Sequence, residues 1–106
     1  MTQSKFSFRS LDLAIQFHDS CQGLALPGYL KNQLLRASSS VALNLAEGYG
    51  KFTPRDRLRF FHIAMGSVRE CQTALRLAPK KDAAVMQTAD HLGACIYKLC
   101  QTQQRQ

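Results

Sequence analysis

Residues 30–50 read LKNQLLRASSSVALNLAEGYG, and this stretch decides the fold. An α-helix places residues three and four apart on one face, because 3.6 residues make a turn. Apolar side chains recur here at that spacing, at Leu30, Leu34, Ala37, Val41 and Leu45. The stretch therefore predicts one long amphipathic helix, with glycines near its carboxyl end that are typical of helix termination.

The same periodicity continues on both sides, and Pro and Gly separate the segments. Thr53-Pro54 supplies a capping side chain followed by a proline at the first helical position. Pro79 ends the segment that follows, because proline lacks the amide proton a helix interior needs. Ser10 is the expected cap of the first segment. We expect four helices, over about 10–24, 28–48, 54–78 and 82–101.

Length and composition favour one all-α domain over residues 1–106. Ala, Leu and Gln total 36 residues, whereas the β-branched Val and Ile total 6. Four amphipathic helices with short connections predict an antiparallel up-down four-helix bundle. The longest stretch without a charged residue, 20–30, is too short to span a membrane. The first twenty residues lack the apolar core of a signal peptide, so a cytoplasmic location is expected.

The four cysteines are expected to be structural thiols rather than metal ligands. They are Cys21, Cys71, Cys95 and Cys100, and no Cys-x-x-Cys pair occurs among them. His18 and His91 stand at helical spacing from Cys21 and Cys95. Zinc sites usually need four convergent ligands, which the scattered acidic residues do not supply. No metal and no cofactor are expected.

Polar side chains form a strip on the second helix and meet others on the third. The strip is Gln33, Arg36, Ser40, Asn44 and Glu47, and the third helix carries His62, Ser67 and Glu70. One interpretation makes Glu47 and Glu70 an acid/base pair. The other makes these residues a polar seam between helices or subunits. No carboxylate adjoins a nucleophile, and Ser67 is not in a Gly-x-Ser-x-Gly turn, so the seam is favoured and no enzyme is expected.

The third helix also has an unusually wide apolar surface. Phe60 and Ile63 extend it beyond a single stripe, and Gly66 stands in mid-helix, where it costs about 1 kcal/mol relative to Ala. Something is therefore expected to approach the backbone near Gly66. Two explanations remain open: packing against the second helix of the same chain, or contact with another subunit.

The charge of the chain points to an anionic partner. There are 14 Lys and Arg against 7 Asp and Glu, giving a net charge of +7. Such a surface attracts phosphates without base specificity, and Tyr49 and Phe52 are candidates for stacking on unpaired bases. Alternatives are a solvated basic face, an acidic protein partner and an anionic membrane surface. The candidate phosphate contacts are Lys51, Arg55, Arg57, Arg59, Lys80 and Lys81.

Two segments carry a family resemblance, residues 33–51 and residues 59–70. They resemble the four-helix-bundle proteins encoded in intervening sequences of bacterial 23S ribosomal RNA genes, also labelled S23 ribosomal proteins. The chain is similar as well to accessory proteins of diversity-generating retroelements. The matching motif residues are Asn44, Ala46, Glu47, Gly48, Phe60, Ile63, Ala64, Gly66, Ser67 and Glu70.

The resemblance implies that the bundle assembles into a ring, with a homopentamer favoured. It implies that the motif residues, with Arg36 beside them, serve assembly, whereas the basic residues contact the ligand. The resulting hypothesis is a non-enzymatic, oligomeric protein that binds nucleic acid, RNA in preference to DNA. The alternative is a scaffold that docks an acidic protein and has no nucleic-acid ligand. A small-ligand or catalytic role would need a solvent-open pocket that holds Glu47 and His62 together.

Overall fold

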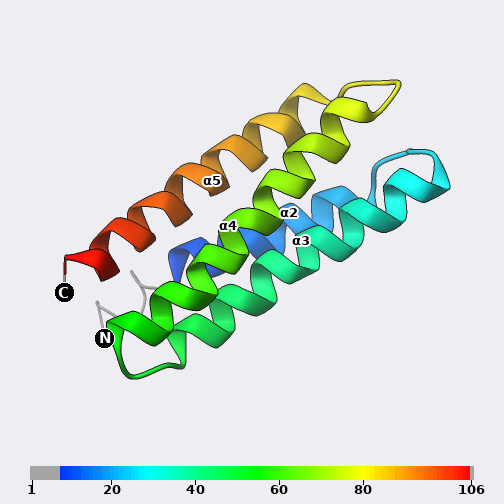
Figure 1. Cartoon of the computed structure of the whole chain (residues 1–106). Coiled ribbons are helices and arrows are strands. Elements are labelled where there is room, and N and C mark those ends of the chain that lie inside the picture. The colour runs from blue at the N-terminus through cyan, green and yellow to red at the C-terminus, as the bar shows by residue number, and fades with distance from the viewer. Residues whose placement is uncertain (1–7, 106) are drawn as a thin grey trace.

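The structure is a computed structural model that describes residues 8–105. These residues form four α-helices and no strand (Figure 1), so the predicted all-α class is confirmed. Residues 1–7 and 106 of the expected domain lie outside the described range. The helices are α2 (Arg9–Gln22), α3 (Gly28–Tyr49), α4 (Pro54–Leu77) and α5 (Ala83–Gln104).

Two of the four helices begin with a side-chain cap. The Thr53 hydroxyl accepts a hydrogen bond from the Asp56 amide at 3.1 Å, and Pro54 takes the first helical position. Asp82 does the same for α5, accepting from the Val85 amide at 3.0 Å. These bonds satisfy amides that the helix itself leaves without a partner. The expected cap at Ser10 is wrong: α2 begins one residue earlier, after Phe8, and Ser10 is buried within it.

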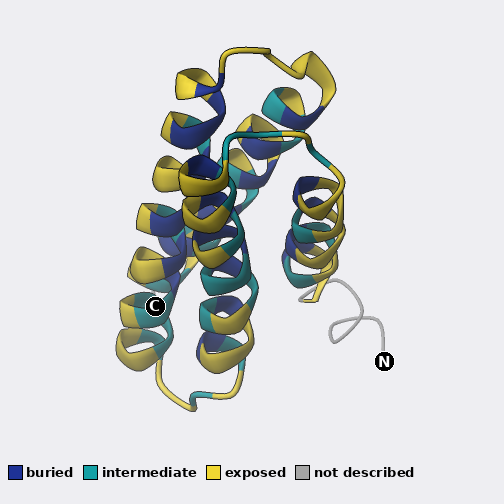
Figure 2. Cartoon of the chain, turned by 90° about the vertical axis from the view of Figure 1, so that its right-hand side faces the viewer, coloured by how far each residue is buried: buried dark blue, intermediate teal, exposed yellow. Residues whose placement is uncertain are grey.

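The helices pack side by side around one core. α3 packs against both α4 and α2, and α5 against both α4 and α2. Figure 1 shows the connection 50–53 at one end of the molecule and the connections 23–27 and 78–82 at the other. In Figure 2 the buried residues face the interior between the helices, and the exposed residues face outward. This pattern follows from the three- and four-residue spacing of the apolar side chains.

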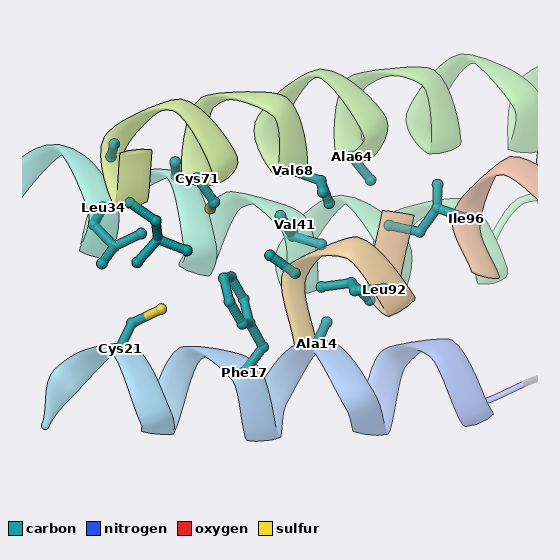
Figure 3. Close-up of a cluster of buried hydrophobic side chains, with 14 of the residues drawn as sticks. Ala14, Phe17, Cys21, Leu34, Val41, Ala64, Val68, Cys71, Leu92 and Ile96 are labelled. Atoms are coloured by element: carbon teal, nitrogen blue, oxygen red, sulfur yellow. The ribbon is translucent and has the colours of Figure 1, made fainter. Parts of the chain in front are cut away.

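The core takes large side chains from every described helix. Phe17 from α2 is fully buried among residues of the other three helices (Figure 3). Burying a side chain of this size contributes about 1.5–3 kcal/mol relative to leaving it exposed. The other large buried side chains are Phe61, Leu34, Leu45, Leu92, Ile96, Val41 and Val68. No helix among the described residues is long and apolar enough to cross a membrane.

Candidate nucleic-acid interface

Two cations lie against the ring of Phe60, near the connection between α3 and α4. The Lys51 Nζ lies 5.2 Å from the ring centroid, and the Arg59 guanidinium carbon lies 5.0 Å from it. Both distances are within the range of a cation–π contact. Lys51 also forms an ion pair with Glu47, with Nζ 3.2 Å from Oε2. The ring of Phe60 therefore holds two positive charges together at this end of the bundle.

Arg55 adds a third positive charge to this end. It stands one helical turn before Arg59 on α4, and both side chains are exposed. Together with Leu58, His62 and Asp56 they line a shallow, open hollow. Within residues 8–105 neither arginine forms an ion pair with a carboxylate. We refer to Lys51, Arg55 and Arg59 as the cation cluster.

Arg57 has a different position from the rest of the predicted basic residues. Its Nη1 donates to the backbone oxygens of Lys51 at 3.1 Å and Phe52 at 2.9 Å. Its Nε donates to the Gln103 side-chain oxygen on α5 at 2.8 Å. The guanidinium thus ties the α3–α4 connection to the far end of the chain. Local sequence spacing does not predict this contact, because Gln103 lies 46 residues after Arg57 in the chain.

Lys80 and Lys81 lie in the connection between α4 and α5, at the opposite end of the bundle (Figure 1). Both side chains are exposed, and the Lys81 ammonium donates to the Ala78 backbone oxygen at 2.5 Å. From Arg59, the last residue of the cation cluster, α4 continues for 18 residues to Leu77, roughly 27 Å at 1.5 Å per residue. The six predicted basic residues are therefore divided between the two ends and do not form one patch.

Three residues of the predicted polar seam, Ser40, Asn44 and Ser67, form hydrogen bonds between α3 and α4 or within α3 beside them. The hydroxyls of Ser40 and Ser67 are 2.8 Å apart, and the Asn44 amide nitrogen lies 3.1 Å from Ser40 Oγ. Asn44 also donates to the backbone oxygen of Ser40 at 2.9 Å. Ser67 is buried. These bonds satisfy polar groups at a tight helix–helix contact.

Gly48 lies at a close approach of α3 and α4. A methyl group added there would lie 2.6 Å from Cε1 of Phe61 and 3.3 Å from Cβ of Phe60. α3 continues through Gly48 to Tyr49, and the backbone at Gly50 remains right-handed with φ of −82°. The predicted helix end at these glycines is confirmed, with Gly50 as the C-cap of α3, and at Gly48 the absent side chain also makes room for α4.

Gly66 differs from Gly48, because apart from the adjoining backbone of α4 and the two neighbouring residues no described atom lies within 4 Å of a Cβ built on it. The residue is exposed on α4, beside Ser67. Two large apolar side chains lie within a turn of the Ser40–Ser67 bond, with Leu43 69% and Ile63 47% exposed. The outer side of α3 and α4 therefore carries two exposed apolar side chains, Leu43 and Ile63, beside the open space at Gly66. Arg36 is exposed on α3, on the same side.

The two glutamates that could form an acid/base pair lie apart. Glu47 pairs with Lys51 beside Phe60, whereas Glu70 lines a groove with Leu30 and Gln33, near the start of α3. About fourteen residues of α3 separate those positions, roughly 20 Å along the helix axis. His62 lines the hollow of Arg55 and Arg59, which does not include Glu47. The structure therefore does not bring the two glutamates together, and the hollow that His62 lines is not the predicted pocket with Glu47.

The two aromatic residues named as stacking candidates have opposite surroundings. Tyr49 packs edge-on between Phe8 and Phe61, with ring centroids 5.3 Å apart in each case. Burial raises the pKa of its hydroxyl, and its side chain is only partly exposed. Phe52 is 96% exposed. Phe52 is therefore the more accessible of the two stacking candidates.

Three of the four cysteines are buried, and all four are free thiols. Burial raises the pKa of Cys21 to about 11 and that of Cys71 to about 12, so both stay protonated at neutral pH. Cys95 is half-buried, with Sγ 4.0 Å from the His91 Nε2. Within residues 8–105 no group of three or more His, Cys, Asp or Glu side chains could hold a metal ion.

Comparison with known proteins agrees with this architecture. Residues 9–102 match the sequence model of the family described as 23S rRNA-intervening sequence protein. The match extends over all four described helices except the last residues of α5. A comparison with curated protein sequences found no match. Because the family match covers most of the chain, this protein belongs to the 23S rRNA-intervening sequence protein family.

Proposed function

We propose that this chain is a non-enzymatic, oligomeric protein that binds nucleic acid, RNA in preference to DNA, through contacts to phosphate groups. The observation that carries the proposal is the cation cluster, where two positive charges share the Phe60 ring and Arg55 extends the positive surface. The net charge of +7 acts in the same direction. Cations that bind phosphate release condensed counterions, which favours association without base-specific contacts.

The distal lysines, Lys80 and Lys81, serve as a second phosphate contact in this proposal. Their distance from the cation cluster exceeds the reach of a few nucleotides, so one short strand does not bind both groups on one copy. In an assembly, neighbouring copies bring further groups within reach. Arg57 is assigned a structural role, because its guanidinium already binds three groups of the chain.

The proposal takes the chain as an antiparallel up-down bundle whose copies form a ring. A homopentamer is favoured by the resemblance to S23 ribosomal proteins and to retroelement accessory proteins. Support comes from the bare apolar surface around Leu43, Ile63 and Gly66. Apolar surface of this kind is stabilised when another subunit covers it. The cation cluster lies at the end of the same two helices, so assembly would set several clusters around one axis.

The test is binding of a structured RNA and a duplex DNA to nuclease-treated protein. In the test variant Lys51, Arg55 and Arg59 are all changed to Glu. A control variant carries the same charge reversals at three exposed cations elsewhere: Arg9, Arg76 and Lys98. We expect the test variant to lose RNA binding sharply and the control to lose much less. Equal losses would mean that only net charge matters and would remove the cation cluster from the proposal.

Both variants must remain folded oligomers, which circular dichroism and light scattering measure. If the folded wild type binds neither nucleic acid at low salt, the positive charge serves solubility or docks an acidic protein. A partner captured equally well before and after nuclease treatment would then support that alternative.

A further inference from the structure

We infer that Phe52 is a stacking site for an unpaired nucleobase, which makes single-stranded RNA, or the unpaired loop of a folded RNA, the ligand of the cation cluster. This inference rests on the proposed function, because it names the ligand class of the same surface. It adds one contact that phosphate attraction alone does not require.

The exposure of Phe52 is the first observation. The ring is 96% exposed, more than any other large hydrophobic side chain within residues 8–105. The neighbouring aromatic residues Tyr49 and Phe61 pack against each other. Aromatic rings at this end of the bundle can therefore be buried, but the Phe52 ring is not. Phe52 faces water although its exposure lowers solubility. An aromatic face left open to solvent is the feature on which bases stack in single-strand-binding proteins.

The backbone that carries Phe52 is held in place, which is the second observation. Arg57 binds the Phe52 backbone oxygen at 2.9 Å and the Lys51 backbone oxygen at 3.1 Å. On the other side of Phe52, the Thr53 hydroxyl caps α4. The ring is therefore presented from a fixed turn. Binding to a pre-ordered group loses less conformational entropy than binding to a mobile one.

The charges beside Phe52 are the third observation. Lys51 precedes it directly, and Arg55 lies in the first turn of α4 three residues later. A single strand places a phosphate on each side of every base, so cations that flank an exposed aromatic residue along the chain match its chemistry. In a duplex the bases already stack on one another and present no free face. The arrangement thus favours unpaired nucleotides.

A second copy of this chain is the other possible occupant of the Phe52 ring. In a symmetric contact through Phe52, the cations of one copy would lie close to those of the next, which is unfavourable. An unpaired base linked to phosphates brings the opposite charge. The observations therefore favour the base, and the test measures the oligomer to exclude the second copy.

The experiment uses Phe52→Ala and Phe52→Trp in the full-length chain. The chain contains no other Trp, so the tryptophan variant carries a single fluorescent reporter at the site. The probes are a short single-stranded RNA, an RNA duplex of equal length, and inorganic polyphosphate, which has phosphates and no bases. The matched control is Tyr97→Ala, which removes an exposed aromatic side chain on α5 near Asp90.

We expect Phe52→Ala to lower affinity for the single strand by roughly 5- to 100-fold, the usual value of one base–aromatic stack. The affinity of Phe52→Ala for the RNA duplex and for polyphosphate should stay at the wild-type level. Tyr97→Ala should bind the single strand, the duplex and polyphosphate as tightly as the wild type does. Phe52→Trp should retain single-strand binding. Its fluorescence should be quenched by the single strand and left unchanged by polyphosphate.

Two outcomes would overturn the inference while leaving the proposed function intact. One is an unchanged single-strand affinity in Phe52→Ala, together with the loss expected for reversal of the cation cluster. The other is a change in oligomer mass in Phe52→Ala, which would make Phe52 a subunit contact. Failure of the wild type to bind any of the three probes would instead contradict the proposed function itself.

Discussion

A Cβ atom at Gly48 would lie 2.6 Å from Cε1 of Phe61, closer than real side chains approach. The Phe61 ring cannot easily move away, because it is fully buried and packs edge-on against Tyr49. We therefore predict that Gly48→Ala lowers the free energy of unfolding by about 1–3 kcal/mol, the usual cost of overpacking. Urea titration followed by circular dichroism measures this. An unchanged or raised stability would contradict the close approach of α3 and α4.

Gly66→Ala is the matched counterpart, because the chain leaves open space at this position. In a single subunit the change should raise helix stability by about 0.5–1 kcal/mol, since Ala loses less backbone entropy on folding than Gly. In the proposed ring, where another copy covers this surface, the added methyl should weaken assembly. Sedimentation over a dilution series separates the two effects. Tighter or unchanged assembly would place the subunit contact elsewhere.

Charge reversal should have different effects at two neighbouring arginines of α4. Arg55 is exposed and forms no ion pair within the described residues, so Arg55→Glu should weaken RNA binding and leave stability within about 0.5 kcal/mol of wild type. Arg57 holds two loop oxygens and Gln103. Arg57→Glu should therefore lower the free energy of unfolding by at least about 1 kcal/mol. Thermal melts and RNA titrations of both variants decide this, and a reversed pattern would refute the assigned roles.

The buried thiols should make the fold sensitive to high pH. Burial raises the pKa of Cys71 from 9.0 to about 12 and that of Cys21 to about 11. Between pH 9 and these raised pKa values, the thiols of the native state keep the protons that the thiols of the unfolded chain have released. The free energy of unfolding should therefore fall as pH rises above about 9, by at most about 1.4 kcal/mol per pH unit for each thiol.

Cys71→Ala tests this effect, because it removes one of the buried groups whose pKa is raised. The variant will be less stable at neutral pH, since it leaves a cavity. The informative quantity is the slope of unfolding free energy against pH above 9, which should be shallower than in the wild type. Parallel slopes in the two proteins would show that Cys71 does not contribute.

The all-α class could be predicted from the sequence because the local signals agree with the tertiary structure. The apolar repeat of residues 30–45 gives the buried face of α3, and Thr53-Pro54 marks the start of α4. Ser10 was the exception. Its hydroxyl suits a cap, but the first turn of α2 begins earlier and Ser10 is buried instead. At Ser10 the burial of the side chain in the bundle outweighs its local preference for a cap. The apolar periodicity of the sequence does not predict where the first turn of this helix begins.

The candidate site was harder to predict, because its parts meet only in three dimensions. The basic residues could be identified in the sequence. Their division into the cation cluster and the distant pair Lys80 and Lys81 depends on the length of α4. The structural use of Arg57 depends on Gln103, on another helix. Tyr49 and Phe52 looked alike in the sequence, yet one ring packs inward and the other is exposed. Nothing in local spacing distinguishes them.

The most direct test of the account is the salt dependence of binding to a single-stranded RNA. For single strands the logarithm of the binding constant falls against the logarithm of salt concentration with a slope of about −0.7 per phosphate contact. We predict a steep slope for the wild type. Changing Lys51, Arg55 and Arg59 together to Ala should make it shallower by about 2. A folded wild-type oligomer that shows no binding at low salt, or a variant that keeps the wild-type slope, would contradict the account.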